Sequence, residues 1–508
     1  MKKVNITLSL AQDESLILDK ALKVSKVRRR DVSSWRIAKK SVDARRKNDI
    51  KILYTIELFE GDEPEKPVYR RVNGKKVIVV GAGPAGLFAA LNLVRHGVSV
   101  TVIERGERVE DRKKTVESFF SGGDLNENSN VQFGEGGAGT FSDGKLFTQV
   151  NSPEIKSVLE DFVCFGAPED ILYLNKPHIG SDNLTKVVKN MREAVIGMGG
   201  TFLFNEKVTA LDVKNGQVKG VFTDKGQYCA DKVVLSIGHS SRDTFTYLYN
   251  EGVAMESKEF AVGLRIEQLQ EVINVDRYGD NYDNKKLPAA DYKLVSHASD
   301  RAVFTFCMCP GGEVVPSASE LGGLVVNGMS NYARSGKNAN SAVICQVKKT
   351  DFGDKPMAGI DFQRSMERLA YAAAGNYIAP VQLAEHFVND QITTGLKGVL
   401  PTYRRGYEFF DLKKLFIKPI SDALKVGLKD MDGKIKGFAS MGAVLTGVET
   451  RTSSPLRIIR NGNFESVSHK NLYPCGEGCG YAGGITSAAV DGIKVSRAIV
   501  DEFLNTDN

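Results

Sequence analysis

The chain has 508 residues, of which 42% are hydrophobic, and a formal net charge of +6. This length predicts two or three domains with ample core. The seven cysteines are an odd number, and the apolar stretch after Lys2 and Lys3 is too short and too interrupted for a secretion signal. These features argue against a secreted, disulfide-linked protein and favour a cytoplasmic one with mostly free thiols.

The positive charge is concentrated at the N-terminus. Residues 1–74 contain 18 Lys and Arg against 11 Asp and Glu, a net charge of +7. Residues 75–508 therefore contain 50 basic and 51 acidic residues. The basic character belongs to the first segment, and the rest of the chain is close to neutral.

The first segment, residues 1–74, is predicted to form a small α+β domain. Asp31 suits the N-cap of a helix, and the apolar residues near both ends of the segment alternate as in strands. The expected order is a strand at 4–10, a helix at 13–22, a helix at 32–47, a strand at 50–58 and a charged linker at 61–66.

The most informative stretch is residues 77–104. A β-branched run leads into Gly81, Gly83 and Gly86 in G-x-G-x-x-G spacing, and a helical stretch and a second apolar run follow. The first glycine permits a sharp turn, and the second lets a pyrophosphate approach the backbone. The third lets helix and strand pack closely. The spacing and its flanks predict a dinucleotide site.

Two further features support this site. The helix that begins at Pro84 and Ala85 directs its unpaired N–H groups toward phosphates. Glu104 closes the second apolar run, where it can accept ribose hydroxyls. A membrane helix is the alternative, because residues 77–94 carry no charge over 18 positions. Three glycines and a proline inside that stretch argue against a membrane span.

A long stretch from 105 to 150, rich in Gly, Ser, Asn and Asp, is predicted to be irregular. Long irregular segments in compact domains are usually functional or disordered. We favour a functional role, because residues 134–145 suit close approach by a ligand. Gly136, Gly137 and Ser142 are the candidate contacts in this loop.

Paired strands are predicted from residue 201 onward. Residues 201–204, 207–213 and 217–223 have strand character, and Asn215-Gly216 is a hairpin signal between the last two. A buried strand that ends in a glycine is expected at 229–238.

Two more segments complete the expected organisation. Strand-like pieces and helices near 362–375 and 412–428 predict a second domain on a largely antiparallel sheet, and residues 472–504 return to a strand, a glycine-rich turn and a long helix. We therefore expect domains at 1–74, 75–255, 256–435 and 436–508, with the second and the fourth forming one discontinuous nucleotide-binding domain.

The G-x-G-x-x-G spacing occurs three times, but only Gly81–Gly86 has full context. At 134–139 no strand precedes it and no amphipathic helix follows, and at 478–483 no second strand ending in an acid follows. One complete half-site favours a single tightly held dinucleotide and no second Rossmann domain for a nicotinamide.

Five stretches of the chain together carry a resemblance to a known family. They are GAGPAG (81–86), ERG (104–106), FGEGGAGTFSDGKL (133–146), VVLSIGHSSRD (233–243) and YPCGEGCGYAGGITSAAVDG (473–492). The chain resembles the glutathione-reductase-type FAD flavoproteins, and within them the FAD-dependent dehydrogenases of unknown substrate. The resemblance implies an α/β fold with a Rossmann-like FAD-binding domain, an inserted antiparallel-sheet α+β substrate domain and a small N-terminal α+β domain.

The resemblance also implies residues for the adenosine and phosphate end of a non-covalent FAD. The three glycines of the first turn would hold the pyrophosphate, and Glu104 the adenosine ribose. Arg105 or Arg112 would lie near the phosphates. Val208 would meet adenine through its backbone, and Gly238 ends the strand beside the cofactor.

Residues near the C-terminus would hold the flavin end. Gly476-Glu477 stands where the family carries Gly-Asp, whose acid binds the ribityl chain, so this contact is altered by one methylene. Gly483, Gly484 and Ile485 would place a helix N-terminus at the pyrimidine edge of the flavin. The positive end of the helix dipole would stabilise an anionic reduced ring.

Three side chains are candidates for the chemistry. Cys307, paired with Cys309 in a C-x-C motif, ends a strand, and buried structural cysteines are the alternative. Lys145 could hold a negative reduced ring, or could be a solvated loop charge. Arg451 could clamp a substrate carboxylate, or could pair with Glu449 across the domains.

Other features favour structural roles. His178 and His239 lie near glycines at strand ends, where hydrogen-bonded structural histidines are common. A metal site of cysteines is not expected. The basic run at 23–51 could bind nucleic acid or anionic lipid, but only Trp35 is interleaved, so a solvated face is favoured.

The sequence thus predicts an FAD-dependent oxidoreductase that transfers a hydride through flavin N5 to or from a small-molecule substrate. NADH or NADPH is a possible diffusible electron donor. The alternatives are an RNA-associated flavoprotein that uses the basic N-terminal domain, and a non-catalytic FAD-binding protein. Substrate, electron acceptor and oligomeric state stay open.

Overall fold

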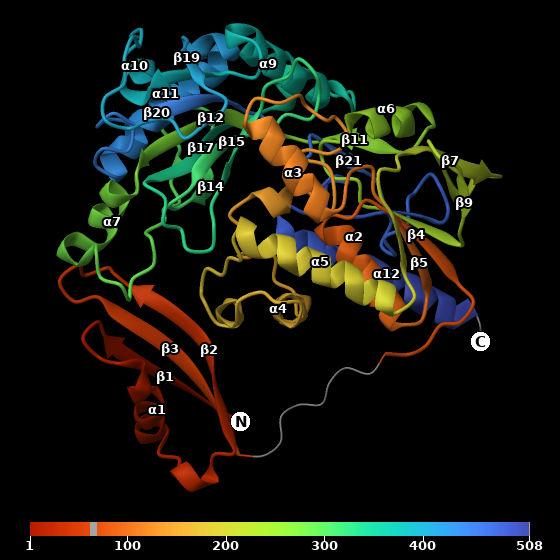
Figure 1. The fold of residues 1–508 in the computed structure, drawn as a ribbon, viewed down its shortest axis with the longest axis horizontal. Coiled ribbons are helices and arrows are strands. Elements are labelled where there is room, and N and C mark those ends of the chain that lie inside the picture. The colour runs from red at the N-terminus through yellow and green to blue at the C-terminus, as the bar shows by residue number, and fades with distance from the viewer. Residues whose placement is uncertain (61–68, 507–508) are drawn as a thin grey trace.

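The computed structural model describes residues 1–60 and 69–506, and the linker expected at 61–66 lies outside them. Figure 1 shows three parts: a small N-terminal unit at the lower left, a body around a parallel sheet at the lower right, and a part built on a large antiparallel sheet above.

The N-terminal unit is an antiparallel sheet with a helix against it. β1 (Lys2–Ser9), β3 (Lys51–Phe59) and β2 (Ser34–Asp43) lie in that order, and α1 (Ile17–Ser25) packs on β1 after the short turn η1 (Glu14–Leu16). The helix predicted at 32–47 is wrong. That segment pairs with β3 from Ser34 to Asp43, and completion of a sheet outweighs local helical propensity.

A parallel sheet forms the centre of the body. Among the described residues its order is β22 (Leu472–Pro474), β10 (Lys232–Leu235), β4 (Lys76–Val80), β5 (Ser99–Ile103) and β6 (Thr201–Leu203). β22 comes from the C-terminal segment and pairs with β10, so this segment returns to the sheet as predicted. β6 was expected to begin a set of paired strands, but it pairs in parallel with β5.

The two faces of the parallel sheet pack into different cores. Val77 and Val79 of β4 point to a core formed with α2 (Pro84–Arg95), α5 (Ser181–Gly197) and α12 (Ile485–Thr506), whereas Ile78 and Val80 point to the other side. Successive residues of a strand face opposite sides, which produces this division. In Figure 1 the helices α2, α5 and α12 run together over one face.

The opposite face is covered by a small antiparallel sheet and by α6 (Arg242–Asn250). The sheet consists of β7 (Val208–Lys214), β8 (Gln217–Thr223) and β9 (Gln227–Cys229). Asn215 and Gly216 both have positive φ between β7 and β8, as the predicted hairpin turn requires.

The segment 105–150 is only partly irregular. α3 (Val109–Phe120) occupies its beginning and buries Val116, Phe119 and Phe120. The prediction of a structureless stretch was wrong here, because the many charged residues of α3 conceal a narrow apolar stripe. The glycine loop that follows contains the short turn η3 (Ala138–Phe141), and α4 (Glu154–Cys164) and η4 (Glu169–Leu172) lie beyond it.

The large sheet builds the second part. Over the described residues its order is β13 (Val295–Ser296), β14 (Val303–Cys309), β17 (Asn338–Val347), β12 (Phe260–Leu269), β20 (Val444–Glu449), β18 (Ala379–Leu383) and β19 (Tyr407–Phe409). Neighbouring strands are antiparallel except β18 and β19. The expected boundary at 435 falls before β20, so the sheet takes in residues that we had placed in the last domain.

Helices and two short ribbons complete this part. The ribbons are β15 (Glu313–Pro316) with β16 (Val326–Met329), and β11 (Met255–Ser257) with β21 (Leu456–Ile458). The second ribbon pairs the chain segments that enter and leave this second part, which we call the insert. The helices are α7 (Gln270–Tyr278), α8 (Lys349–Phe352), α9 (Ala358–Ala374), α10 (Ala384–Val388) and α11 (Lys418–Lys434). Within residues 1–60 and 69–506, none of the helices has the length and apolarity needed to cross a bilayer.

Candidate functional site

A cavity of about 1040 Å³ lies between the parallel sheet and the large antiparallel sheet. Gly81, Glu104, Ser236 and Cys475 line it, and each directly follows the end of a parallel strand. Open α/β sheets bind ligands outside the carboxyl ends of their strands. The insert supplies the opposite wall, including Phe304 to Met308 of β14.

The glycines of the first turn differ in what surrounds them. Gly81 has φ +98°, and a Cβ there would lie 2.4 Å from the Ser236 carbonyl oxygen. A Cβ on Gly86 would lie 1.9 Å from the Gly81 carbonyl oxygen, so this glycine permits the close helix–strand packing. A Cβ on Gly83 would meet only the Gly137 Cα, at 3.8 Å. Gly83 therefore presents open backbone to the cavity, as a pyrophosphate cradle needs.

Glu104 and Arg105 directly follow the end of β5 at the cavity. The buried Glu104 carboxylate accepts hydrogen bonds from the backbone amides of Ala82 (2.8 Å), Gly106 (2.9 Å) and Gly134 (3.1 Å), which fixes it against the glycine turn. Arg105 pairs with Asp243 at 3.0 Å and also lines the cavity.

Four expected cofactor residues lie outside the cavity wall: Gly86, Arg112, Gly136 and Gly476. Arg112 is fully buried, and its guanidinium donates to the carbonyl oxygens of Asn130, Val131, Gly134 and Glu135. It therefore holds the glycine loop from behind and does not face a phosphate. A Cβ on Gly136 would lie 2.1 Å from Thr140 Oγ1, so this glycine serves the fold of the loop.

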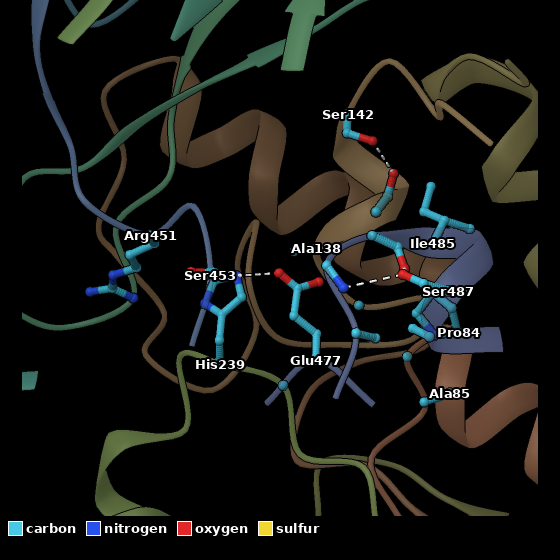
Figure 2. A pocket seen from close by; sticks show the side chains of 18 of the residues that line it. Pro84, Ala85, Ala138, Ser142, His239, Arg451, Ser453, Glu477, Ile485 and Ser487 are labelled. Carbon is cyan, nitrogen blue, oxygen red and sulfur yellow. Dashed lines mark hydrogen bonds and ion pairs between the residues drawn. The ribbon is translucent and has the colours of Figure 1, made fainter. Parts of the chain in front are cut away.

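Glu477 and His239 lie together where the loop before α12 meets the cavity. Figure 2 shows Glu477 between His239 on one side and Ile485 and Ser487 on the other. Glu477 Oε1 is 4.0 Å from His239 Nε2, and the Gly483 amide donates to Ser487 Oγ at 3.1 Å. Burial raises the pKa of Glu477 to about 7 and lowers the pKa of His239 to about 3. At neutral pH the histidine is therefore uncharged and the acid is close to its midpoint.

Lys145 projects from the glycine loop into the cavity wall. Its ammonium is 3.3 Å from Asp143, a buried carboxylate that also accepts from Arg334 Nε at 2.9 Å and from Ser330. Burial lowers the pKa of Lys145, but the Asp143 carboxylate, together with the nearby Cys309 and Cys307, raises it by more, so the net shift is upward and the side chain is charged. The Nζ atom is buried and makes no hydrogen bond within the described protein. An acceptor atom on a ligand would satisfy it.

Cys307 faces the cavity from a distorted part of β14. It has φ +48°, and the register with β17 shifts between Phe306 and Cys309. Its carbonyl oxygen accepts from Arg265 Nη2 at 2.7 Å. Cys309 is fully buried and lies outside the wall, so the two thiols do not face one ligand. Burial raises the pKa of Cys307, which favours the protonated thiol at neutral pH.

Arg451 lines the cavity but is engaged in a buried ion cluster. Its guanidinium donates to the Glu367 carboxylate at 2.8 and 3.1 Å, and Arg242 of α6 binds the same carboxylate. The alternative pairing of Arg451 with Glu449 is wrong, because Glu449 pairs with Arg265 at 2.9 Å. In Figure 2 the Arg451 side chain points away from Glu477 and Ile485.

The other sequence candidates all line the cavity. They are Gly81, Gly83, Pro84, Ala85, Glu104, Arg105, Gly137, Ser142, Lys145, Val208, Gly238, Cys307, Glu477, Gly483, Gly484 and Ile485. Their contacts with a cofactor stay predictions.

Sequence reasoning missed part of the wall, notably Lys258, Arg334, Phe304 and Phe306. The alternation in β14 could have placed the two phenylalanines on one face. No local signal distinguishes Lys258 or Arg334 from other surface charges.

Several basic residues of the N-terminal unit are paired with carboxylates. Arg36 and Lys3 both contact Glu57, and Arg45 contacts Asp43. None of the described residues of 1–60 lines the cavity. This pairing gives the nucleic-acid alternative no added support.

Comparison with known proteins follows the division of the chain. Residues 75–244 match the pyridine nucleotide-disulphide oxidoreductase family, residues 259–452 match the "FAD-dependent protein, C-terminal domain-like" family, and residues 1–59 match a domain of unknown function. An uncharacterized protein of Clostridium beijerinckii is 46% identical over 525 residues, 98% of each chain. The chain belongs to the FAD-dependent oxidoreductases. In this oxidoreductase the segments matched by the two larger family models meet at the cavity, with Gly81 in the first and Cys307 in the second.

Other similarities are local or weak. The glutamate synthase [NADPH] small chain of Mycobacterium tuberculosis is 51% identical over 47 residues, 9% of each chain. Glycine oxidase from Bacillus cereus has a TM-score of 0.32 and 11% identity, covering 84% of this chain and 98% of its own. CtdE in complex with FAD has a TM-score of 0.33 and 14% identity, covering 85% of this chain and 84% of its own. Similarity at this level is too low to bear on the fold or the site of this oxidoreductase.

Proposed function

We propose that the main cavity holds one non-covalent FAD, stretched from Glu104 and Val208 across the glycine turn to the N-terminus of α12. The observation that carries the proposal is the convergence of four strand ends, the open backbone of Gly83 and the start of α12 on one continuous cavity. The proposed reaction is two-electron oxidation or reduction of a small molecule. Bound FAD supplies this chemistry by exchanging a hydride at N5.

The residues of the chain have distinct proposed roles. The Gly81 turn and the first amides of α2 bind the pyrophosphate, because amides at a helix start have no acceptor within the helix. Gly483 to Ile485 direct the first amides of α12 at the flavin end, where they favour negative charge. Glu477, whose pKa lies near neutrality, would contact the ribityl chain in place of the family's aspartate.

Lys145 and Cys307 are the proposed catalytic residues. Lys145 carries a charged ammonium with unsatisfied donors into the wall, so it would hold negative charge on the ring or on a substrate. Asp143 is a positioning residue that fixes Lys145. Arg451, an initial candidate for binding a substrate carboxylate, is already held by Glu367, so we propose that it shapes the wall and orders the domain contact.

Flavin spectroscopy of the purified protein tests the proposal. We expect a yellow protein whose flavin band is retained on desalting and bleaches anaerobically with a reductant. NADH and NADPH are tested separately as physiological donors. Colourless protein that does not take up added FAD would contradict the proposed site. Bound flavin that no nicotinamide or metabolite reduces would favour the non-catalytic alternative.

A further inference from the structure

A second cavity of about 390 Å³ adjoins the main one on the insert side. Phe304, Phe306, Thr452, Ser453 and Gly483 line both cavities, so the two share a wall. A Cβ on Gly483 would have no heavy atom within 4 Å, which leaves the shared wall open at the loop before α12. The volume falls within the range of small-molecule sites.

The lining of this second cavity is one face of the large sheet. Ala261, Ile344, Phe304 and Phe306 form a small apolar cluster of their own, separate from the main core of the insert. Both phenylalanines are only partly buried, so their rings present surface to the cavity. Aromatic rings in such a wall favour contact with another ring.

Two of the polar side chains at this cavity are already engaged in hydrogen bonds. Thr452 Oγ1 donates to the Ala261 carbonyl oxygen at 2.8 Å, and the Gln346 amide donates to Glu259 at 3.1 Å. Of the described residues that line it, Glu259 alone carries a charge. The main cavity, by contrast, is lined by eight Lys and Arg residues, among them Lys145, Lys258 and Arg334, and by six Asp and Glu residues. An anionic group would therefore find partners in the main cavity but not in the second.

We infer that the second cavity binds an uncharged aromatic ring of the substrate and holds it beside the flavin end of the main cavity. The inference rests on the proposed function, because Gly483 borders the second cavity and also the place proposed for the flavin. The substrate is then a small molecule with a neutral planar ring. Its ring lies against Phe304 and Phe306, away from the charged residues of the main cavity.

Binding of 2-naphthol and of 2-naphthoate to the FAD-loaded protein tests this inference. The two probes have the same ring system, and only the second is an anion at neutral pH. We expect 2-naphthol to bind at least about tenfold more tightly, which corresponds to 1.4 kcal/mol. The readouts are calorimetric titration and the change in the flavin absorption spectrum.

Two variants test whether 2-naphthol binds in the second cavity. Ala302 lines only the second cavity, so Ala302→Phe should fill it and weaken 2-naphthol binding about tenfold or more. Ala372→Phe, on an exposed position of α9 outside both cavities, is the matched control and should leave binding unchanged. Glu259→Lys should reduce the ratio of the affinities for 2-naphthol and 2-naphthoate. If Ala302→Phe does not fold, Glu259→Lys serves as the test in its place.

The outcomes separate the inference from the proposed function. Equal or tighter binding of 2-naphthoate, absence of 2-naphthol binding, or tight 2-naphthol binding that Ala302→Phe leaves intact would each overturn the inference in a protein that still carries reducible flavin. Failure to bind FAD at all would instead contradict the proposed function.

Discussion

Two glycines of the same turn perform different tasks. The space available for an added methyl group differs between them. Gly83 faces open space, whereas Gly86 lies against the Gly81 carbonyl oxygen. The backbone at Gly83 has φ −74°, which any residue can adopt. A substitution at Gly83 should therefore affect the ligand, and the same substitution at Gly86 should affect the fold.

We expect Gly83→Ala to weaken FAD binding about tenfold, because the added methyl occupies the pyrophosphate cradle, with little change in the stability of the FAD-free protein. Gly86→Ala should destabilise the protein by about 1–3 kcal/mol through overpacking. Flavin titration and thermal unfolding measure the two effects. A Gly83→Ala variant with unchanged FAD affinity would count against the cradle.

The titration of Glu477 gives a second prediction at this scale. Its pKa is raised from 4.5 to about 7, so the folded state favours the neutral acid. Between pH 4.5 and 7 the unfolded chain releases this proton while the folded chain retains it, and stability falls as pH rises. Glu477→Gln has no titrating group at this position, so its stability does not show this fall with rising pH.

The melting temperature of Glu477→Gln, relative to the wild type, should therefore rise across pH 4.5 to 7 and level off above. FAD-free protein is used, because the proposed ribityl contact would change the environment of the acid. A pH-independent difference between the two proteins would contradict a raised pKa.

At the scale of elements, the packing of α12 on α2 sets the geometry of the cofactor end. A Cβ on Gly492 of α12 would lie 2.2 Å from the carbonyl oxygen of Ala85, in the first turn of α2. Both helix starts line the cavity, so a shift between the helices changes the distance between its two ends.

Gly492→Ala should destabilise the protein despite the better helix propensity of alanine, and should also weaken FAD binding. Gly433 in α11 is the matched control, because a Cβ there meets nothing within 4 Å. Gly433→Ala should stabilise by at most about 0.5–1 kcal/mol, because Gly433 lies next to the C-terminal residue of α11. Chemical denaturation and flavin titration of both variants test the helix contact. A Gly492→Ala variant as stable as the control would refute it.

At the scale of the molecule, a buried ion cluster joins the two parts that form the cavity. Glu367 of α9 binds both Arg242, from the nucleotide-binding body, and Arg451, from the insert. These cations lower the pKa of Glu367 despite burial, so its contribution to stability is present above its ordinary value of 4.5 and declines as pH falls below it.

Glu367→Gln should cost up to about 3–5 kcal/mol at neutral pH, because two buried guanidinium groups lose the carboxylate that they share and keep only Glu320 as counterion. The gap to the wild type should narrow on acidification. Asp361→Asn on the same helix is the control: its side chain is 74% exposed, and we expect a change within about 0.5 kcal/mol. Equal stability of the two variants would show that the cluster does not hold the parts together.

The sequence by itself determined the strand, glycine turn and helix that we propose to hold the dinucleotide. A strand, a glycine turn, a helix and a closing acid lie within 28 consecutive residues. Each of them is specified by neighbouring residues, so Gly81, Gly83 and Glu104 could be assigned to this unit without a structure. The hairpin at Asn215-Gly216 and the return of the C-terminal strand were predictable for the same reason, since turn chemistry and residue period are local signals.

Tertiary structure decided what depends on distant partners. Residues 34–43, within the segment predicted as a helix, form a strand because β3 offers an edge. Arg112 binds carbonyl oxygens of a loop 18 to 23 positions later and does not face the cavity. Arg451 met Glu367, 84 positions away, and not the neighbouring Glu449. Side chains of opposite charge pair by proximity in space, and the sequence order does not record which surfaces the fold brings together.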